Sequence, residues 1–163
     1  MLEAGNIPAR IYQEVDVPVK IKVLLVDDDF SVRESLQRVL QSENYDVVSA
    51  SNGREAVERF CEQSIDLVLL DLNMPVLNGW EALERMKAIN PFLLTIIITA
   101  RPNQYELAAQ AGAVAIMEKP LTLPLLLDLM SRVMKEPLEV RKQRITAHKP
   151  IRLCEVETTN YLN

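Results

Sequence analysis

Residues 22–29 read KVLLVDDD, a short apolar run that ends in three aspartates. Two later runs end in a similar way: LVLLD at residues 67–71 and VAIMEK at residues 114–119. Short apolar runs bounded by turn residues are typical of buried parallel strands. The ligand site of an open parallel sheet lies beyond the carboxyl ends of its strands. The sequence therefore predicts that at least three carboxylates and one ammonium group gather at one edge of a sheet.

Strand-like runs alternate with helical patterns between residues 21 and 135, which favours an α/β fold with a parallel sheet. We expect five strands and five helices, with the second strand at 46–50 and the fourth at 94–98. Three local expectations accompany this pattern. Ser31 caps the first helix, Thr122 caps the last, and Cys61 lies on the buried stripe of the second helix.

Composition limits the classes of protein that fit. The chain has 163 residues, is 48% hydrophobic and has a net charge of −5, which suits one domain and argues against general nucleic-acid binding. No apolar run reaches the ~18 residues of a membrane span, and the two cysteines lack metal-ligand spacing. We therefore expect a soluble cytoplasmic protein with no membrane association.

Three segments are predicted along the chain. Residues 1–20 form an N-terminal arm, 21–135 form the domain, and 136–163 form a C-terminal tail. The tail is too short for an independent fold, so we expect a solvated or frayed helical extension and no output domain, a DNA-binding domain included.

The predicted sheet edge suits phosphoryl chemistry. Magnesium prefers oxygen ligands in near-octahedral geometry and keeps several waters, so carboxylates with free positions beside them suit it. A carboxylate such as Asp71 can attack a phosphoryl group and form an aspartyl phosphate. An acidic triplet after a strand is more often a solvated turn when taken alone, so it is the combination of strand ends that carries the prediction.

The motifs VDDD at 26–29, DLNMP at 71–75 with Gly79, Thr99-Ala100 and Lys119-Pro120 occur in this order. Together they closely resemble the receiver domain of two-component response regulators, over about residues 21–135. The resemblance implies a flavodoxin-like, doubly wound, five-stranded parallel sheet with strand order 2-1-3-4-5.

The resemblance also implies a Mg²⁺ site. Asp28 matches a direct metal ligand and Asp27 one that acts through water. Asn73 would offer its backbone carbonyl, and the carboxylate of Asp71 completes the metal-binding set.

The phosphoryl group has its own implied residues. Asp71 matches the phosphoacceptor, and Lys119 should pair with its carboxylate or with a phosphoryl oxygen. Thr99 should donate its hydroxyl to a second oxygen and Ala100 its backbone N–H to a third. The Lys119-Pro120 bond is one that family members often have in the cis form.

Two positions depart from the family pattern. Ile116 stands where many receivers have an aromatic switch residue, and isoleucine has a different shape and no phenolic hydroxyl. Arg101-Pro102 follows Thr99 in a loop that is about two residues shorter than usual. We hypothesise that Arg101 lies over the phosphoryl group and alters its hydrolysis; an exposed, unconnected arginine is the equal alternative.

The functional expectation is a stand-alone receiver, a phosphoprotein of phosphorelay signal transduction rather than an enzyme. Its partners would be a sensor histidine kinase or phosphotransfer protein and a downstream protein target, and homodimerisation is open. One alternative is a haloacid-dehalogenase-like phosphatase that uses Asp27 as its nucleophile. Another is a receiver-like docking scaffold that is never phosphorylated.

Overall fold

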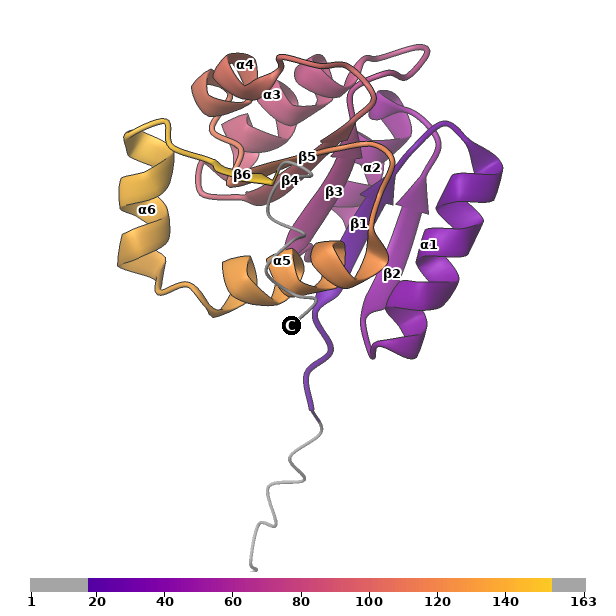
Figure 1. The fold of residues 1–163 in the computed structure, drawn as a ribbon. Coiled ribbons are helices and arrows are strands. Elements are labelled where there is room, and N and C mark those ends of the chain that lie inside the picture. The colour runs from indigo at the N-terminus through magenta and orange to yellow at the C-terminus, as the bar shows by residue number, and fades with distance from the viewer. Residues whose placement is uncertain (1–17, 154–163) are drawn as a thin grey trace, which may run out of the picture.

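A six-stranded parallel sheet forms the centre of the molecule in the computed structural model, which describes residues 18–153 (Figure 1). Its strands are β1 (Lys22–Val26), β2 (Asp46–Ala50), β3 (Leu67–Asp71), β4 (Leu94–Thr99), β5 (Ala115–Glu118) and β6 (Ile151–Leu153). They lie side by side in the order β2-β1-β3-β4-β5-β6. The five predicted strands and their order are confirmed, and β6 is a sixth strand that was not predicted.

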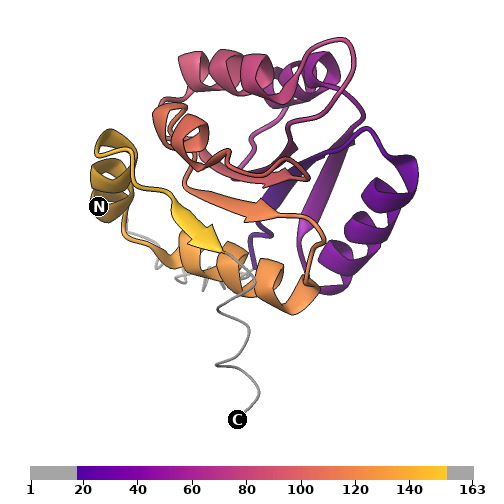
Figure 2. The same ribbon diagram turned by 45° about the horizontal axis from the view of Figure 1, so that its top comes forward.

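The helices cover both faces of the sheet. They are α1 (Phe30–Ser42), α2 (Gly53–Glu62), α3 (Gly79–Ile89), α4 (Tyr105–Gln110), α5 (Leu123–Lys135) and α6 (Leu138–Thr146). Helices α1 and α5 lie on one face and α2, α3 and α4 on the other, while α6 stands beside the β5–β6 edge (Figures 1 and 2). None of the helices within residues 18–153 is long and apolar enough to cross a membrane.

Alternate residues of the central strands enter two separate cores. In β1, Val23 and Leu25 pack with the residues of α1 and α5, whereas Leu24 and Val26 pack with those of α2 and α3. All four are at most 1% exposed. Burial on both faces explains why the central strands read as continuous apolar runs rather than alternating ones.

Side chains at the helix starts show where the prediction was wrong. Asp29, not Ser31, caps α1, because its carboxylate accepts hydrogen bonds from the N–H groups of Ser31 and Val32. Ser31 already lies inside the helix and supplies one of the amides to be capped. Thr122 occupies the N-cap position of α5, but its side chain makes no capping hydrogen bond.

Cys61 is exposed, contrary to the expectation of a core residue. The buried residues of α2 include Ala56 and Phe60, which are four positions apart and therefore share one face. Cys61 follows Phe60 by one residue, a rotation of about 100° around the helix, which turns it away from the sheet.

The C-terminal segment, defined here as residues 138–153, returns to the sheet. Helix α6 buries none of its residues, in keeping with the predicted solvated helix. The chain then turns, and β6 pairs with β5 through the register Ala115↔Ile151, with the N–H of Ile151 donating to the Val114 carbonyl at 2.8 Å. The sheet thus extends beyond the predicted domain boundary at residue 135.

Two polar contacts join the same segment to α4. The Tyr105 hydroxyl donates to the Pro150 carbonyl at 3.2 Å. The Nδ1 atom of His148 lies 2.9 Å from the Ala109 carbonyl oxygen. The predicted arm at residues 1–20 and the end of the predicted tail fall largely outside the described residues.

Candidate functional site

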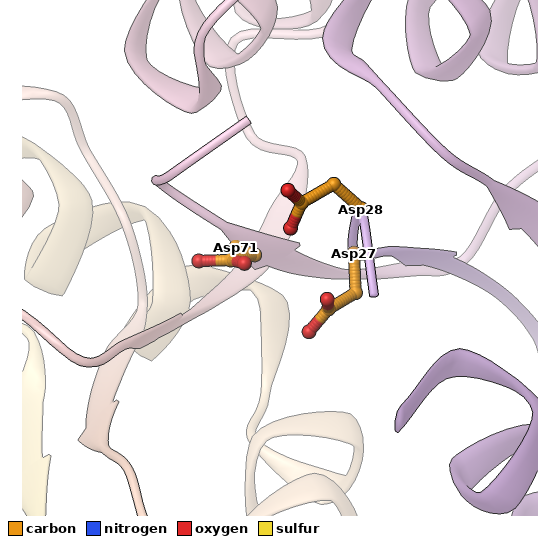
Figure 3. A group of neighbouring side chains, drawn as sticks. All are labelled: Asp27, Asp28 and Asp71. Atoms are coloured by element: carbon orange, nitrogen blue, oxygen red, sulfur yellow. The ribbon is translucent and has the colours of Figure 1, made fainter. Parts of the chain in front are cut away.

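Three aspartates meet at the carboxyl ends of β1 and β3. Asp27 and Asp28 follow β1 directly, and Asp71 is the last residue of the neighbouring strand β3. One carboxylate oxygen of each lies within 4.8 Å of the others. Figure 3 shows Asp27 and Asp28 extending from one backbone segment on the side where Asp71 lies. The predicted gathering of carboxylates is therefore present in the structure.

The exposure of the three acids differs. Asp27 and Asp71 are 3% and 4% exposed, whereas Asp28 is open to solvent. Burying an unpaired carboxylate is costly, and both buried acids have an ammonium or N–H group as a hydrogen-bond partner. Asp28 is thus the most solvent-accessible of the three carboxylates.

Lys119 connects the two buried acids. Its Nζ atom lies 3.0 Å from Oδ2 of Asp27 and 3.5 Å from Oδ2 of Asp71. The contact with Asp71 agrees with the prediction, whereas the shorter contact with Asp27 was not predicted. The peptide bond between Lys119 and Pro120 is cis, as the resemblance implied.

The charges of this cluster influence one another. Burial raises the pKa of the Asp71 carboxyl, although the Asn73 backbone N–H and the Lys119 ammonium act to lower it. Burial alone would lower the pKa of Lys119, but its hydrogen bond to Asp27 and the charges of Asp27 and Asp71 raise it above the ordinary lysine value. Lys119 is therefore held as an ammonium ion at neutral pH.

The loop after β1 is fixed by several hydrogen bonds. The Asp27 N–H donates to the Ala50 carbonyl at 3.2 Å, and the Asp29 N–H donates to Oδ1 of Asp27 at 2.9 Å. The Asp27 carbonyl accepts from Nη1 of Arg33 at 2.7 Å. Arg33 was not predicted as a site residue, because an arginine in a helical pattern carries no local signal of such a contact.

The loop after β3 is held by close backbone contacts. The Asn73 N–H donates to Oδ1 of Asp71 at 3.1 Å, and the Gly53 N–H donates to the Leu77 carbonyl at 3.1 Å. A Cβ atom on Gly53 would lie 2.3 Å from the Leu77 oxygen, and one on Gly79 would lie 2.5 Å from the Asp71 oxygen. These contacts leave no room for a side chain at either glycine.

The remaining predicted residues lie around the end of β4. Thr99 is fully buried and its Oγ1 accepts a hydrogen bond from the Arg101 N–H at 3.0 Å. Ala100 and Arg101 are exposed, and Ile116 is buried in the core on the α2–α4 side. The roles of these residues stay predictions.

The donor set fits a magnesium ion. Carboxylate oxygens are the hard ligands that Mg²⁺ prefers, and Asp28 leaves the cluster open to water on one side. The acidic cluster is thus compatible with a divalent cation.

The sequence matches the family of response regulator receiver domains over residues 23–131, and the chain belongs to that family. It is 37% identical over 117 residues to the response regulator MprA of Mycolicibacterium vanbaalenii, which covers 71% of this chain and 51% of MprA. It is 33% identical over 113 residues to sporulation initiation phosphotransferase F of Bacillus subtilis, covering 68% of this chain and 91% of that protein.

A solved structure shows the same fold. The response regulator TrrA of Thermotoga maritima, solved in complex with Mg²⁺ and BeF, aligns with a TM-score of 0.64 and 30% identity over 69% of this chain and 97% of TrrA. The chain spans about half the length of MprA and most of the length of the other two proteins.

Proposed function

We propose that this chain is a phosphoacceptor response regulator in which Asp71 receives a phosphoryl group from a histidine kinase or a phosphorelay partner. The observation that carries the proposal is the buried carboxylate of Asp71 between a lysine ammonium and two further aspartates. An oxygen of Asp71 forms a bond to phosphorus while the phosphorus–nitrogen bond of the donor's phosphohistidine breaks and the imidazole leaves. The similarity to a phosphotransferase and to a response regulator supports the same reaction.

Charge neutralisation is the main task of the surrounding residues. Lys119 lies within reach of Asp71 and would pair with the oxygens of the attached phosphoryl group. A Mg²⁺ ion held by Asp28, Asp71 and the Asn73 carbonyl, with Asp27 acting through water, would supply positive charge beside those oxygens. TrrA, solved with Mg²⁺ and BeF, supports this assignment by similarity.

The signal would leave through the end of β4. Thr99 would donate its hydroxyl to the phosphoryl group, and the Ala100 N–H would bind another oxygen. Because the Arg101 N–H donates a hydrogen bond to the Thr99 hydroxyl, a shift of Thr99 would move the loop that leads into α4. A downstream protein would then recognise the altered α4 surface.

Phosphorylation assays separate this proposal from its alternatives. We would incubate the protein with Mg²⁺ and a small phosphoryl donor such as phosphoramidate, and detect the acid-stable, base-labile adduct by mass spectrometry. Asp71→Asn should abolish the adduct, whereas Asp46→Asn, which removes an exposed carboxylate paired with Lys22, should leave it unchanged.

Two outcomes would contradict the proposal. An adduct that persists in Asp71→Asn but disappears in Asp27→Asn would assign the nucleophile to Asp27, as in the phosphatase alternative. A wild-type protein that binds Mg²⁺ and forms no adduct with phosphoramidate or with a histidine kinase would leave the docking scaffold as the function.

A further inference from the structure

We propose that Arg33 is a positioning residue that sets the relative direction of the Asp27 and Asp28 carboxylates. The functional importance of this role rests on the proposed function, because those carboxylates belong to the proposed metal site. Arg33 itself lies in the first turns of α1 and not among the acids. It would act on the site through the backbone.

The contact falls on the peptide unit that joins the two acids. Nη1 of Arg33 donates to the Asp27 carbonyl oxygen at 2.7 Å. That carbonyl belongs to the Asp27–Asp28 peptide, which is planar, so holding its oxygen restrains rotation of the whole peptide unit. The orientation of this unit sets the directions of the two Cα–Cβ bonds relative to each other. Hydrogen bonds from a charged donor are shorter and stronger than neutral ones, which suits this task.

Other hydrogen bonds hold different parts of the same loop. The Asp27 N–H is bonded to Ala50 across to β2, and the Asp29 N–H to the Asp27 side chain. Asp29 in turn caps α1. These bonds anchor the two ends of the loop, whereas Arg33 reaches the peptide between them.

The guanidinium group of Arg33 is placed for this contact by its surroundings. Its Cζ atom lies 5.7 Å from the centre of the Phe30 ring, a cation–π distance. Within residues 18–153, no carboxylate oxygen lies within 4 Å of the guanidinium nitrogens of Arg33. Arg38, which lies further along α1, is paired with Glu34. The charge of Arg33 is therefore directed to a backbone carbonyl rather than to a surface ion pair.

The Arg33→Gln and Arg38→Gln variants test the inference, since each removes one positive charge from α1. The first readout is the mobility of the Asp28 amide, measured by ¹⁵N relaxation in the metal-free protein. We expect faster motion of this amide in Arg33→Gln and wild-type motion in Arg38→Gln. Equal mobility in both variants would overturn the inference.

The second readout is Mg²⁺ binding, measured by calorimetry with the metal alone at about 0.3 M salt to screen long-range charge. We expect binding about fivefold to tenfold weaker in Arg33→Gln, from the loss of one charge-assisted hydrogen bond, and an unchanged constant in Arg38→Gln. Tighter binding in Arg33→Gln would mean that Arg33 acts only by charge repulsion and would overturn the inference.

Arg33→Lys serves as the second variant if Arg33→Gln fails to fold. It keeps the charge but lacks the planar fork, so it should restore Mg²⁺ binding only in part. Full wild-type Mg²⁺ affinity and Asp28 mobility in Arg33→Lys would contradict a role for the guanidinium geometry. A wild-type protein that binds no Mg²⁺, with a loosened Asp28 amide in Arg33→Gln, would refute the proposed metal site and leave the positioning contact standing.

Discussion

Val76 has a backbone conformation that is unfavourable for its β-branched side chain. It has φ of 70°, in the left-handed region, and the Leu77 N–H bonds to the Pro75 carbonyl around it at 2.9 Å. Its side chain is 71% exposed, so packing contributes little in return. A β-branched residue in this region is uncommon and costs about 1–3 kcal/mol. The loop that follows Asp71 therefore stores strain.

Val76→Gly should relieve that strain. We expect the free energy of unfolding to rise by about 1 kcal/mol, because glycine adopts a positive φ freely. Part of this gain is lost because glycine increases the conformational entropy of the unfolded chain. Urea denaturation measures the change. Val76→Ala is the control: it keeps a Cβ atom and should recover less than glycine does. Lower stability in Val76→Gly than in wild type would show that the turn is not strained.

Lys87 gives stability a pH dependence. Burial lowers the pKa of its ammonium group to about 8, against about 10.4 for an exposed lysine. Below pH 8 both the folded and unfolded states are protonated, and the full cost of burying the charge is present. Between pH 8 and about 10.4 the unfolded state binds more protons, so this group's contribution to stability rises with pH.

Lys87→Met should therefore stabilise the protein at pH 7, by about 1 kcal/mol after allowance for partial exposure of the side chain. The advantage over wild type should shrink as the pH is raised from 8 to 10. Urea denaturation at three pH values in this range measures the difference, with the exposed Lys20→Met as the control. An advantage that grows with pH would contradict the lowered pKa.

At the scale of elements, the strand ends were predictable and the helix starts were less so. Strands β1 and β3 are buried on both faces, so their apolar runs stop where the polar site begins, and Asp27 and Asp71 could be placed from the sequence alone. The start of α1 is ambiguous, because Asp29 and Ser31 are both good caps. Only the backbone conformation of Asp29, extended with ψ of 113°, decides between them.

Asp29→Ala should destabilise the protein by about 1 kcal/mol, since two amides of α1 lose their acceptor at 2.8 and 3.1 Å. Ser31→Ala should change stability by only a few tenths of a kcal/mol, because its amide rather than its hydroxyl takes part in the cap. Thermal denaturation of both variants measures this. A larger loss in Ser31→Ala than in Asp29→Ala would reverse the assignment.

Contacts between elements that are distant along the chain could not be predicted from the sequence. The shorter ion pair of Lys119 with Asp27 depends on side-chain positions that converge only after β1 and β5 take their places in the sheet. The contact of Arg33 depends on how α1 leaves its loop. Strand β6 has three residues and follows an exposed helix, so no periodic pattern in the sequence indicated a strand there.

At the scale of the whole molecule, the C-terminal segment adds the edge strand β6 next to β5. One short strand, the hydroxyl of Tyr105 and the contact of His148 join it to the body of the domain. Ile145 and Ile151 also pack on the core, Lys142 lies over the Phe92 ring and Arg144 pairs with Glu136, but no residue of α6 is fully buried. Segments with few buried contacts open more readily than the core. Amide exchange at residue 151 should therefore report opening of this segment apart from global unfolding.

Tyr105→Phe should speed that exchange. Removing the hydroxyl deletes the hydrogen bond to the Pro150 carbonyl, worth about 1 kcal/mol, so the Ile151 amide should exchange about fivefold faster. Hydrogen exchange followed by NMR measures the rate. Tyr45→Phe, at the residue before β2, should leave the Ile151 rate unchanged. Equal rates in wild type and Tyr105→Phe would show that this hydrogen bond does not hold the segment.

The position of β6 affects competition for the sheet. An open strand edge is where another chain can add a strand of its own. Here the chain's own residues 151–153 pair with β5 and are connected to it through α5 and α6, so their pairing is intramolecular and does not depend on protein concentration. A partner that adds a strand to β5 must outcompete that tethered strand, so weak strand-adding partners would be excluded from β5.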